Sequence, residues 1–131
     1  MYRLSIEDRF AAAHNLRNYE GDCERLHGHN WRVRVEVGAA ELDNQQMVLD
    51  FREMKALLKE ALEPLDHEYL NETPPFDTIN PTTESLCRYI AERLGRRLPE
   101  RISLRRVECW ESENCGATYL PPRPPEESSN G

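Results

Sequence analysis

The sequence has 131 residues, of which 38% are hydrophobic and 31% are charged, so its length and composition suit one globular domain. The formal net charge is −7, and we interpret the local groups of arginines as solvated faces, so nucleic acid is not expected as a partner. No apolar run approaches the ~20 residues that a membrane-spanning helix needs, and the charged N-terminus does not resemble a signal peptide. We therefore expect a cytoplasmic protein that makes no membrane contact and whose four cysteines stay reduced.

Two segments near the N-terminus alternate between apolar and polar residues as half-buried strands do. Residues 1–14 form the first, with His14 on the apolar face, although Asp8 could interrupt the strand. The polar residues that follow predict a loop. The clearest strand covers residues 27–37, where His27 and His29 share a face with a tryptophan and three valines.

Two helices follow, separated by a long loop. Asp50 is a plausible N-cap, and the apolar residues after it recur at intervals of three and four, which predicts an amphipathic helix. Residues 66–82 contain three prolines and predict a loop. A second amphipathic helix is expected to start near Thr82 or Thr83 and to end before Pro99.

The C-terminal part predicts two more strands. In residues 101–112, Val107 and Cys109 fall on odd positions, whereas Ile102 and Leu104 before them fall on even positions. The strand therefore either contains a bulge or starts late. Residues 116–120 predict a short fourth strand.

The order β-β-α-α-β-β predicts an α+β fold, in which an antiparallel four-stranded sheet carries both helices on one face. Residues 1–120 would form this domain. The proline-rich, acidic residues 121–131 predict a disordered tail.

Three histidines predict a metal site. Because side chains alternate along a strand, His27 and His29 project from the same face, with Cβ atoms about 7 Å apart. If the first two strands pair antiparallel, His14 lies beside them. Three imidazoles with one free position are typical of catalytic zinc. The alternative is that these histidines are ordinary polar residues at a strand end.

Cys23 and His67 are the other candidates for chemistry. Cys23 lies four residues before His27 and could be a base or nucleophile, a fourth metal ligand, or an inert thiol; spacing alone leaves the three open. His67 follows Asp66, and a turn would let this carboxylate orient the imidazole for proton transfer. Alternatively, His67 simply follows a helix C-terminus, where the dipole favours it.

Glu111 lies at the end of the third predicted strand, with the parity of the buried residues. A carboxylate in this position is costly unless it is paired, and it would suit a guanidine-like N–H pair such as the edge of a pterin or a guanine. A solvated glutamate at a strand end is the alternative.

Several motifs occur in an order that resembles one family. They are FAAAH (10–14), CERLHGHNW (23–31), LDF (49–51), LDHEYLN (65–71), NPTTE (80–84) and VECWES (107–112). Together they resemble the 6-pyruvoyltetrahydropterin synthase and 6-carboxytetrahydropterin synthase family over residues 1 to about 120. The resemblance implies a tunnelling fold, whose ββααββ subunits join into barrels as trimers that stack into hexamers.

The resemblance also implies roles for the candidate residues. His14, His27 and His29 look like the zinc ligands. Cys23 looks like the catalytic base, and Asp66 with His67 looks like the rest of its proton-transfer group, in sites that often draw residues from adjacent subunits. Glu111 looks like the pterin anchor, and Thr82, Thr83 and Glu84 would lie near the ring. Ser112 stands where the family usually has threonine.

The spacing C-x-x-x-H-G-H resembles the 6-carboxytetrahydropterin synthases of queuosine and deazaguanine biosynthesis. The implied substrate is 7,8-dihydroneopterin triphosphate, and the implied products are 6-carboxy-5,6,7,8-tetrahydropterin, acetaldehyde and triphosphate. One alternative is 6-pyruvoyltetrahydropterin synthase, which eliminates triphosphate only. The other is a non-catalytic zinc- or pterin-binding module, which would not need Cys23, Asp66 and His67.

Overall fold

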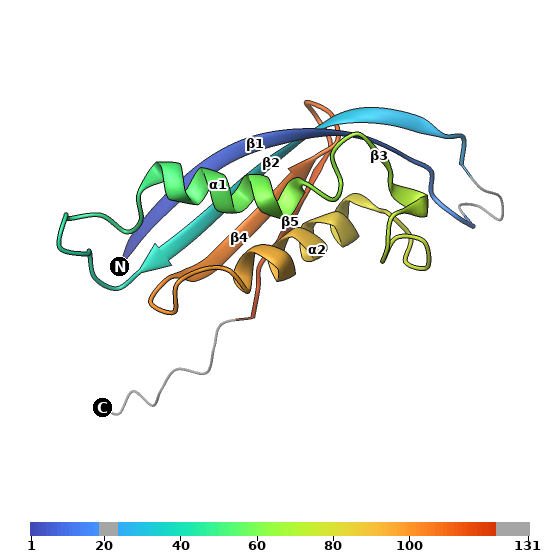
Figure 1. The fold of residues 1–131 in the computed structure, drawn as a ribbon. Coiled ribbons are helices and arrows are strands. Elements are labelled where there is room, and N and C mark those ends of the chain that lie inside the picture. The colour runs from blue at the N-terminus through green and yellow to red at the C-terminus, as the bar shows by residue number, and fades with distance from the viewer. Residues whose placement is uncertain (19–23, 123–131) are drawn as a thin grey trace.

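Two long strands form the centre of the sheet. The computed structural model describes residues 1–18 and 24–122, and Figure 1 shows their arrangement. Strand β1 (Tyr2–His14) pairs antiparallel with β2 (His27–Ala39) along its whole length. Both strands match the predicted segments, and β1 runs through Asp8 without interruption.

The sheet has one strand more than predicted. Its order is β3-β1-β2-β4-β5, where β4 (Ser103–Trp110) and β5 (Gly116–Tyr119) are the two predicted C-terminal strands. The additional strand β3 (Glu68–Tyr69) pairs parallel to β1 inside the predicted loop, which also contains a 3-10 helix, η1 (Leu70–Glu72). A strand of two residues is too short to show a recognisable alternation of apolar and polar residues. The α+β class is confirmed.

A bulge in β4 resolves the conflict of parity in the third predicted strand. Glu36 of β2 lies opposite Arg106, and Val37 lies opposite Leu104, so Arg105 is the extra residue. The bulge brings the apolar residues before and after Arg105 to the same face of the sheet.

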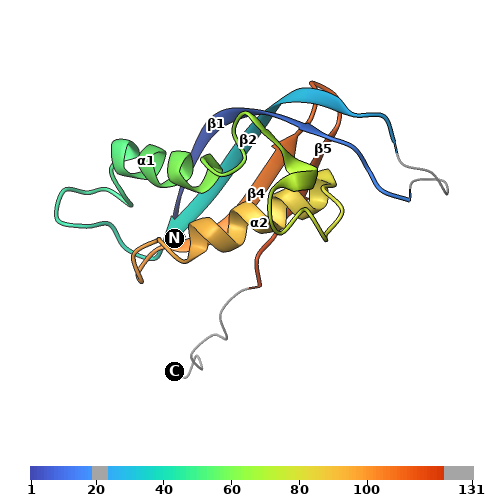
Figure 2. The same cartoon turned by 45° about the vertical axis from the view of Figure 1, so that its right-hand side comes forward.

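Both helices pack on one face of the sheet, as Figures 1 and 2 show. Helix α1 (Phe51–Leu62) begins after Asp50, whose carboxylate accepts a hydrogen bond from Arg52 N at 2.8 Å, as predicted for an N-cap. Helix α2 (Thr83–Gly95) begins after Thr82, whose hydroxyl accepts from Ser85 N at 3.1 Å. The helices contact β1, β4 and β5 and close the core on this side.

The opposite face of the sheet carries charges, and no helix of the described residues packs on it. Ion pairs join Arg3 to Glu36 at 3.6 Å and Arg106 to Glu108 at 3.0 Å. No helix in the described part of the chain is both long and apolar enough to cross a bilayer. Of the predicted tail, residues 123–131 lie outside the described residues, so its disorder stays a prediction.

Candidate metal centre and active site

The three predicted metal ligands meet at the end of the β1–β2 ribbon. In the antiparallel register, His14 is the partner of His27, and Ala12 is the partner of His29. One nitrogen from each imidazole lies within 4.8 Å of the other two. The register therefore assembles the cluster that the alternation of residues predicted.

Backbone carbonyls fix the orientation of two of these rings. His14 Nδ1 lies 2.8 Å from the Pro81 carbonyl oxygen, and His27 Nδ1 lies 2.8 Å from the Arg25 carbonyl oxygen. A carbonyl can only accept a hydrogen bond, so each Nδ1 carries the hydrogen and donates. In the neutral ring the lone pair is then on Nε2, as a metal ligand requires.

The burial of the cluster supports a metal as the missing partner. His14 is 2% exposed, and the Nε2 atoms of His14 and His29 are buried without a hydrogen-bond partner among the described residues. Burial lowers the pKa of His14 below its usual 6.5, which favours the neutral form that binds metals. Two orphaned nitrogens in a set of three imidazoles fit zinc or a similar transition metal.

Trp31 packs against the cluster from the side of the core. This contact was not predicted from the sequence. Its ring is fully buried and contacts the rings of His14 and His29 edge-on, with centroids 5.0 and 5.3 Å apart. Trp31 has the same parity as the two β2 histidines, and this signal could have identified it. The indole closes the apolar side of the site.

Glu111 lies beside the histidine cluster. Its Oε1 is 4.0 Å from the Nε2 atoms of both His14 and His29 and accepts a hydrogen bond from the Thr83 hydroxyl at 3.2 Å. The carboxylate is half-buried, so it can reach a ligand that enters from solvent. A group bound to the histidines and one bound to Glu111 would therefore be neighbours.

The other residues predicted near the pterin ring have different surroundings. The Thr82 hydroxyl caps α2 and also donates to Ser85 Oγ at 3.1 Å. Glu84 lies in the first turn of α2 with an exposed side chain. Of the three residues after Pro81, Thr83 is therefore the one that contacts Glu111.

Asp66 and His67 form the predicted pair. Asp66 Oδ2 lies 3.1 Å from His67 Nδ1, and Asp66 Oδ1 accepts from Ala11 N at 3.0 Å. His67 has a φ of 62°, and this left-handed backbone supplies the turn that two adjacent side chains need in order to meet. The Ala11 N–H that donates to Asp66 holds the pKa of this carboxyl below its usual 3.8.

Among the described residues, no hydrogen bond or ion pair joins the His67 side chain to the histidine cluster, although His67 and His29 line the same hollow. The His67 side chain is 80% exposed and lines an open hollow of about 460 Å³, which His29 of the cluster also lines, together with Ala11, Ala13, Gly28 and Asn30. These four residues alternate with the cluster residues along β1 and β2, so they belong to the opposite face of the sheet. Cys23, the third predicted catalytic residue, lies outside the described residues.

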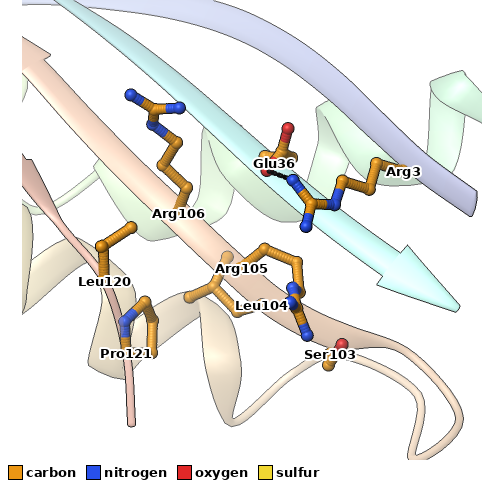
Figure 3. Close-up of a pocket in the computed structure, with 8 residues that line it drawn as sticks. All are labelled: Arg3, Glu36, Ser103, Leu104, Arg105, Arg106, Leu120 and Pro121. Atoms are coloured by element: carbon orange, nitrogen blue, oxygen red, sulfur yellow. Dashed lines mark ion pairs between the residues drawn. The ribbon is translucent and has the colours of Figure 1, made fainter. Parts of the chain in front are cut away.

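A different pocket of about 250 Å³ lies at the far end of the sheet (Figure 3). Arg3 points toward Glu36 at its rim, and Arg105, Arg106 and Leu120 line it further. Arg3 and His14 are separated along β1 by roughly 35 Å of strand rise. This pocket contains none of the predicted site residues.

An α+β fold with a cluster of three histidines, of which His14 is buried, and an adjacent carboxylate defines a candidate metalloenzyme. Residues 3–122 match the family described as 6-pyruvoyl tetrahydropterin synthase, and the chain belongs to this family. The match spans nearly all described residues, so the resemblance expected from the motifs is confirmed.

Known relatives carry more than one activity in their names. The chain is 36% identical over 129 residues to a 6-carboxy-5,6,7,8-tetrahydropterin synthase of Synechocystis, covering 94% of this chain and 96% of the relative. It is 34% identical over 114 residues to a dihydroneopterin monophosphate aldolase of Pyrococcus furiosus, covering 87% and 93%. The structure of Caenorhabditis elegans 6-pyruvoyl tetrahydropterin synthase has a TM-score of 0.79 at 23% identity, covering 92% and 96%, and shares the fold.

Proposed function

We propose that the chain is a zinc-dependent 6-carboxy-5,6,7,8-tetrahydropterin synthase. It would convert 7,8-dihydroneopterin triphosphate and water into 6-carboxytetrahydropterin, acetaldehyde and triphosphate, in the cytoplasm, as a step toward queuosine and other deazaguanines. The observation that carries the proposal is the three-histidine cluster with two orphaned Nε2 atoms, 4.0 Å from Glu111. The 36% identity to a synthase of this name supports the choice of reaction.

His14, His27 and His29 would hold the zinc through their Nε2 atoms. Zinc in such a site polarises bound oxygen and acidifies a bound hydroxyl group. The Pro81 and Arg25 carbonyls keep two of the rings in the required tautomer, and Trp31 shields the cluster from the core side. These residues would hold the hydroxyl-bearing side chain of the substrate at the metal.

Glu111 would anchor the pterin. A carboxylate can accept two parallel hydrogen bonds from the guanidine-like edge of the ring, and Thr83 orients it by donating to Oε1. Thr82 and Glu84 would lie near the same end of the ring. The pterin edge would therefore bind beside the N-terminus of α2.

Cys23, Asp66 and His67 would move protons. The Cys23 thiolate would remove a proton from the substrate side chain, and His67, held by Asp66, would return one elsewhere. His67 lines a hollow with His29 but has no hydrogen bond to the cluster among the described residues, which agrees with a site shared between subunits of a homo-hexamer. The substrate is then bound where two chains meet.

The same residues could serve a 6-pyruvoyltetrahydropterin synthase, and this second candidate is favoured by the family match itself. Both reactions would use the same metal, thiol and anchor. They differ in whether the carbon–carbon bond of the substrate side chain is cleaved.

The test is mass spectrometry of the products after the zinc-loaded chain is incubated with 7,8-dihydroneopterin triphosphate. We expect 6-carboxytetrahydropterin and acetaldehyde in equal amounts. A pyruvoyl product would assign the second candidate, and a dihydropterin with a shortened side chain would indicate an aldolase. Cys23→Ala should abolish turnover and keep the zinc, whereas His29→Ala should lose both. No turnover by a zinc-loaded chain would contradict both enzyme candidates.

A further inference from the structure

Two asparagine side chains hydrogen-bond to the backbone of the residues that follow β1, as a neighbouring strand would. Asn15 N donates to Asn71 Oδ1 at 3.0 Å, and Asn71 Nδ2 donates back to Asn15 O at 2.8 Å. Arg17 N donates to Asn80 Oδ1 at 2.8 Å, and Asn80 Nδ2 donates to Arg17 O at 3.4 Å. A carboxamide offers one donor side and one acceptor, as a peptide group does, so each side chain pairs with both polar groups of one backbone residue.

The Arg17 side chain ties the same two segments together from the other direction. Its guanidinium donates to the carbonyl oxygens of Asn71 at 3.0 Å, Phe76 at 2.6 Å and Ile79 at 3.2 Å. The planar, forked group is suited to hold several acceptors at fixed angles. We call Arg17, Asn71 and Asn80 the amide clamp, because they hold residues 15–17 against the loop that leads to α2.

The amide clamp flanks a hydrogen bond of the metal cluster. His14 directly precedes Asn15, and Pro81 directly follows Asn80, so both partners of the 2.8 Å bond from His14 Nδ1 to Pro81 O adjoin a clamped residue. The Asn80 carbonyl is itself fixed, since it accepts from Ser85 Oγ at 2.6 Å and from Thr82 N at 2.8 Å. The position of the Pro81 carbonyl thus depends on the clamp.

We propose that the amide clamp positions His14 for metal binding. It holds the Pro81 carbonyl where it fixes the His14 tautomer and aims the Nε2 lone pair at the other two histidines. Arg17, Asn71 and Asn80 are positioning residues, because they act through Pro81 and His14. The inference rests on the proposed zinc site, and it extends that site to residues 54 to 63 positions apart in the sequence.

Co²⁺ is the probe, because its visible absorption reports both affinity and the geometry of the ligands. Titration of the metal-free full chain gives the dissociation constant for the unaltered protein and for Asn80→Ala. We expect Asn80→Ala to bind Co²⁺ about 10- to 100-fold more weakly, the usual cost of losing a group that orients a metal ligand. Asn80→Asp keeps the acceptor for Arg17 N, so its affinity should stay within about threefold of the original.

Thr78→Ala is the matched control in the same loop. The Thr78 hydroxyl donates to Pro75 O and makes no hydrogen bond to residues 15–17 or Pro81, so its loss should leave the Co²⁺ affinity unchanged. Should Asn80→Ala not fold, Arg17→Met tests the clamp from the other segment, with the same expected loss of affinity. Urea unfolding of each metal-free variant separates a general loss of stability from a loss of affinity.

The outcomes separate the two proposals. Original Co²⁺ affinity in folded Asn80→Ala or Arg17→Met, or an equal loss in Thr78→Ala, would overturn the clamp and leave the metal site standing. Failure of the unaltered chain to bind Co²⁺ or Zn²⁺ would overturn both. Weaker binding confined to the clamp variants, with rescue by Asn80→Asp, would support the positioning role.

Discussion

Two backbone carbonyls decide the chemistry of the histidine cluster. Because Pro81 and Arg25 accept hydrogen bonds from Nδ1, His14 and His27 already have the tautomer that a metal needs. The lowered pKa of His14 adds to this, since the ring is neutral near neutral pH. A metal would therefore find two ligands oriented before it binds, which reduces the reorganisation that binding requires.

The neighbouring residues Thr82 and Thr83 should respond differently to the same substitution. Thr82→Ala removes the cap of α2 and should lower the free energy of unfolding by about 1 kcal/mol, measured by urea denaturation. Thr83→Ala removes the donor to Glu111 and should instead raise the KM for the pterin substrate, with a change in stability below about 0.5 kcal/mol. Equal effects of the two variants on both measurements would contradict these roles.

At the scale of single elements, the short strand β3 depends on one carboxylate. Asp66 accepts from Ala11 N, and His67 N donates to Ala11 O at 2.6 Å, so this point joins the end of α1 to β1. The contact also places the Asp66–His67 pair at the edge of the sheet. The strength of this contact with Ala11 should depend on the charge of Asp66.

The pH dependence of this contact follows from the lowered pKa of Asp66. A carboxyl whose folded pKa lies below its unfolded value of 3.8 stabilises the fold above that value, and the contribution disappears as pH falls through the folded pKa. The urea midpoint of the original chain should therefore exceed that of Asp66→Asn at pH 6, and the difference should shrink as pH falls below 3.8. A difference that is constant from pH 6 to pH 2 would contradict the prediction.

The bulge in β4 keeps the strand in register with the core. Deletion of Arg105 would turn Ile102, which is 5% exposed, and Leu104 toward the helix-free face. We expect the free energy of unfolding to fall by roughly 2–4 kcal/mol, because apolar area is lost from the core. Arg105→Ala keeps the residue count and should cost less than about 1 kcal/mol in the same urea experiment. A deletion variant as stable as Arg105→Ala would show that the bulge is dispensable.

Periodicity was enough to predict most elements and the clustering of the three histidines. The alternation of β1 and β2 put His14, His27 and His29 on one face, and the cap at Asp50 marked the start of α1. For the third predicted strand, the sequence left two options open, a bulge or a late start. The apolar residues change parity along the segment, but this pattern does not show where a bulge would lie. Strand β3 gave no signal, since its pairing depends on tertiary contacts.

The amide clamp could not be predicted either, for a different reason. Its hydrogen bonds join side chains to backbone groups more than fifty positions away, and no spacing rule links such partners. Asn71 and Asn80 each looked like ordinary loop residues. Only the folded backbone shows that they replace a strand.

At the scale of the whole molecule, the sheet leaves two edges for assembly. Strands β3 and β5 are the terminal strands, and exposed edges are usually covered by another strand or chain. The helix-free face carries opposite charges in pairs, such as Arg32 with Glu7 at 3.7 Å. Closure of several sheets into a barrel would cover both edges.

Assembly with shared sites can be tested by mixing inactive chains. Light scattering should give six times the 15.3 kDa mass of one chain.

If Cys23 and His67 of one site come from different chains, a refolded equal mixture of Cys23→Ala and His67→Ala should recover about a quarter of the original activity, because random pairing leaves that share of sites intact. Each variant alone should stay inactive. A mixture without activity would place both residues in the same chain.

The packing of Trp31 against His14 and His29 has a practical consequence. The indole is fully buried and packs nearly perpendicular to both rings, so its fluorescence should respond to an ion bound at the three histidines. A paramagnetic ion such as Co²⁺ at the three histidines should quench the emission of Trp31. The protein thus contains its own optical reporter of metal occupancy, which can be read without any added dye.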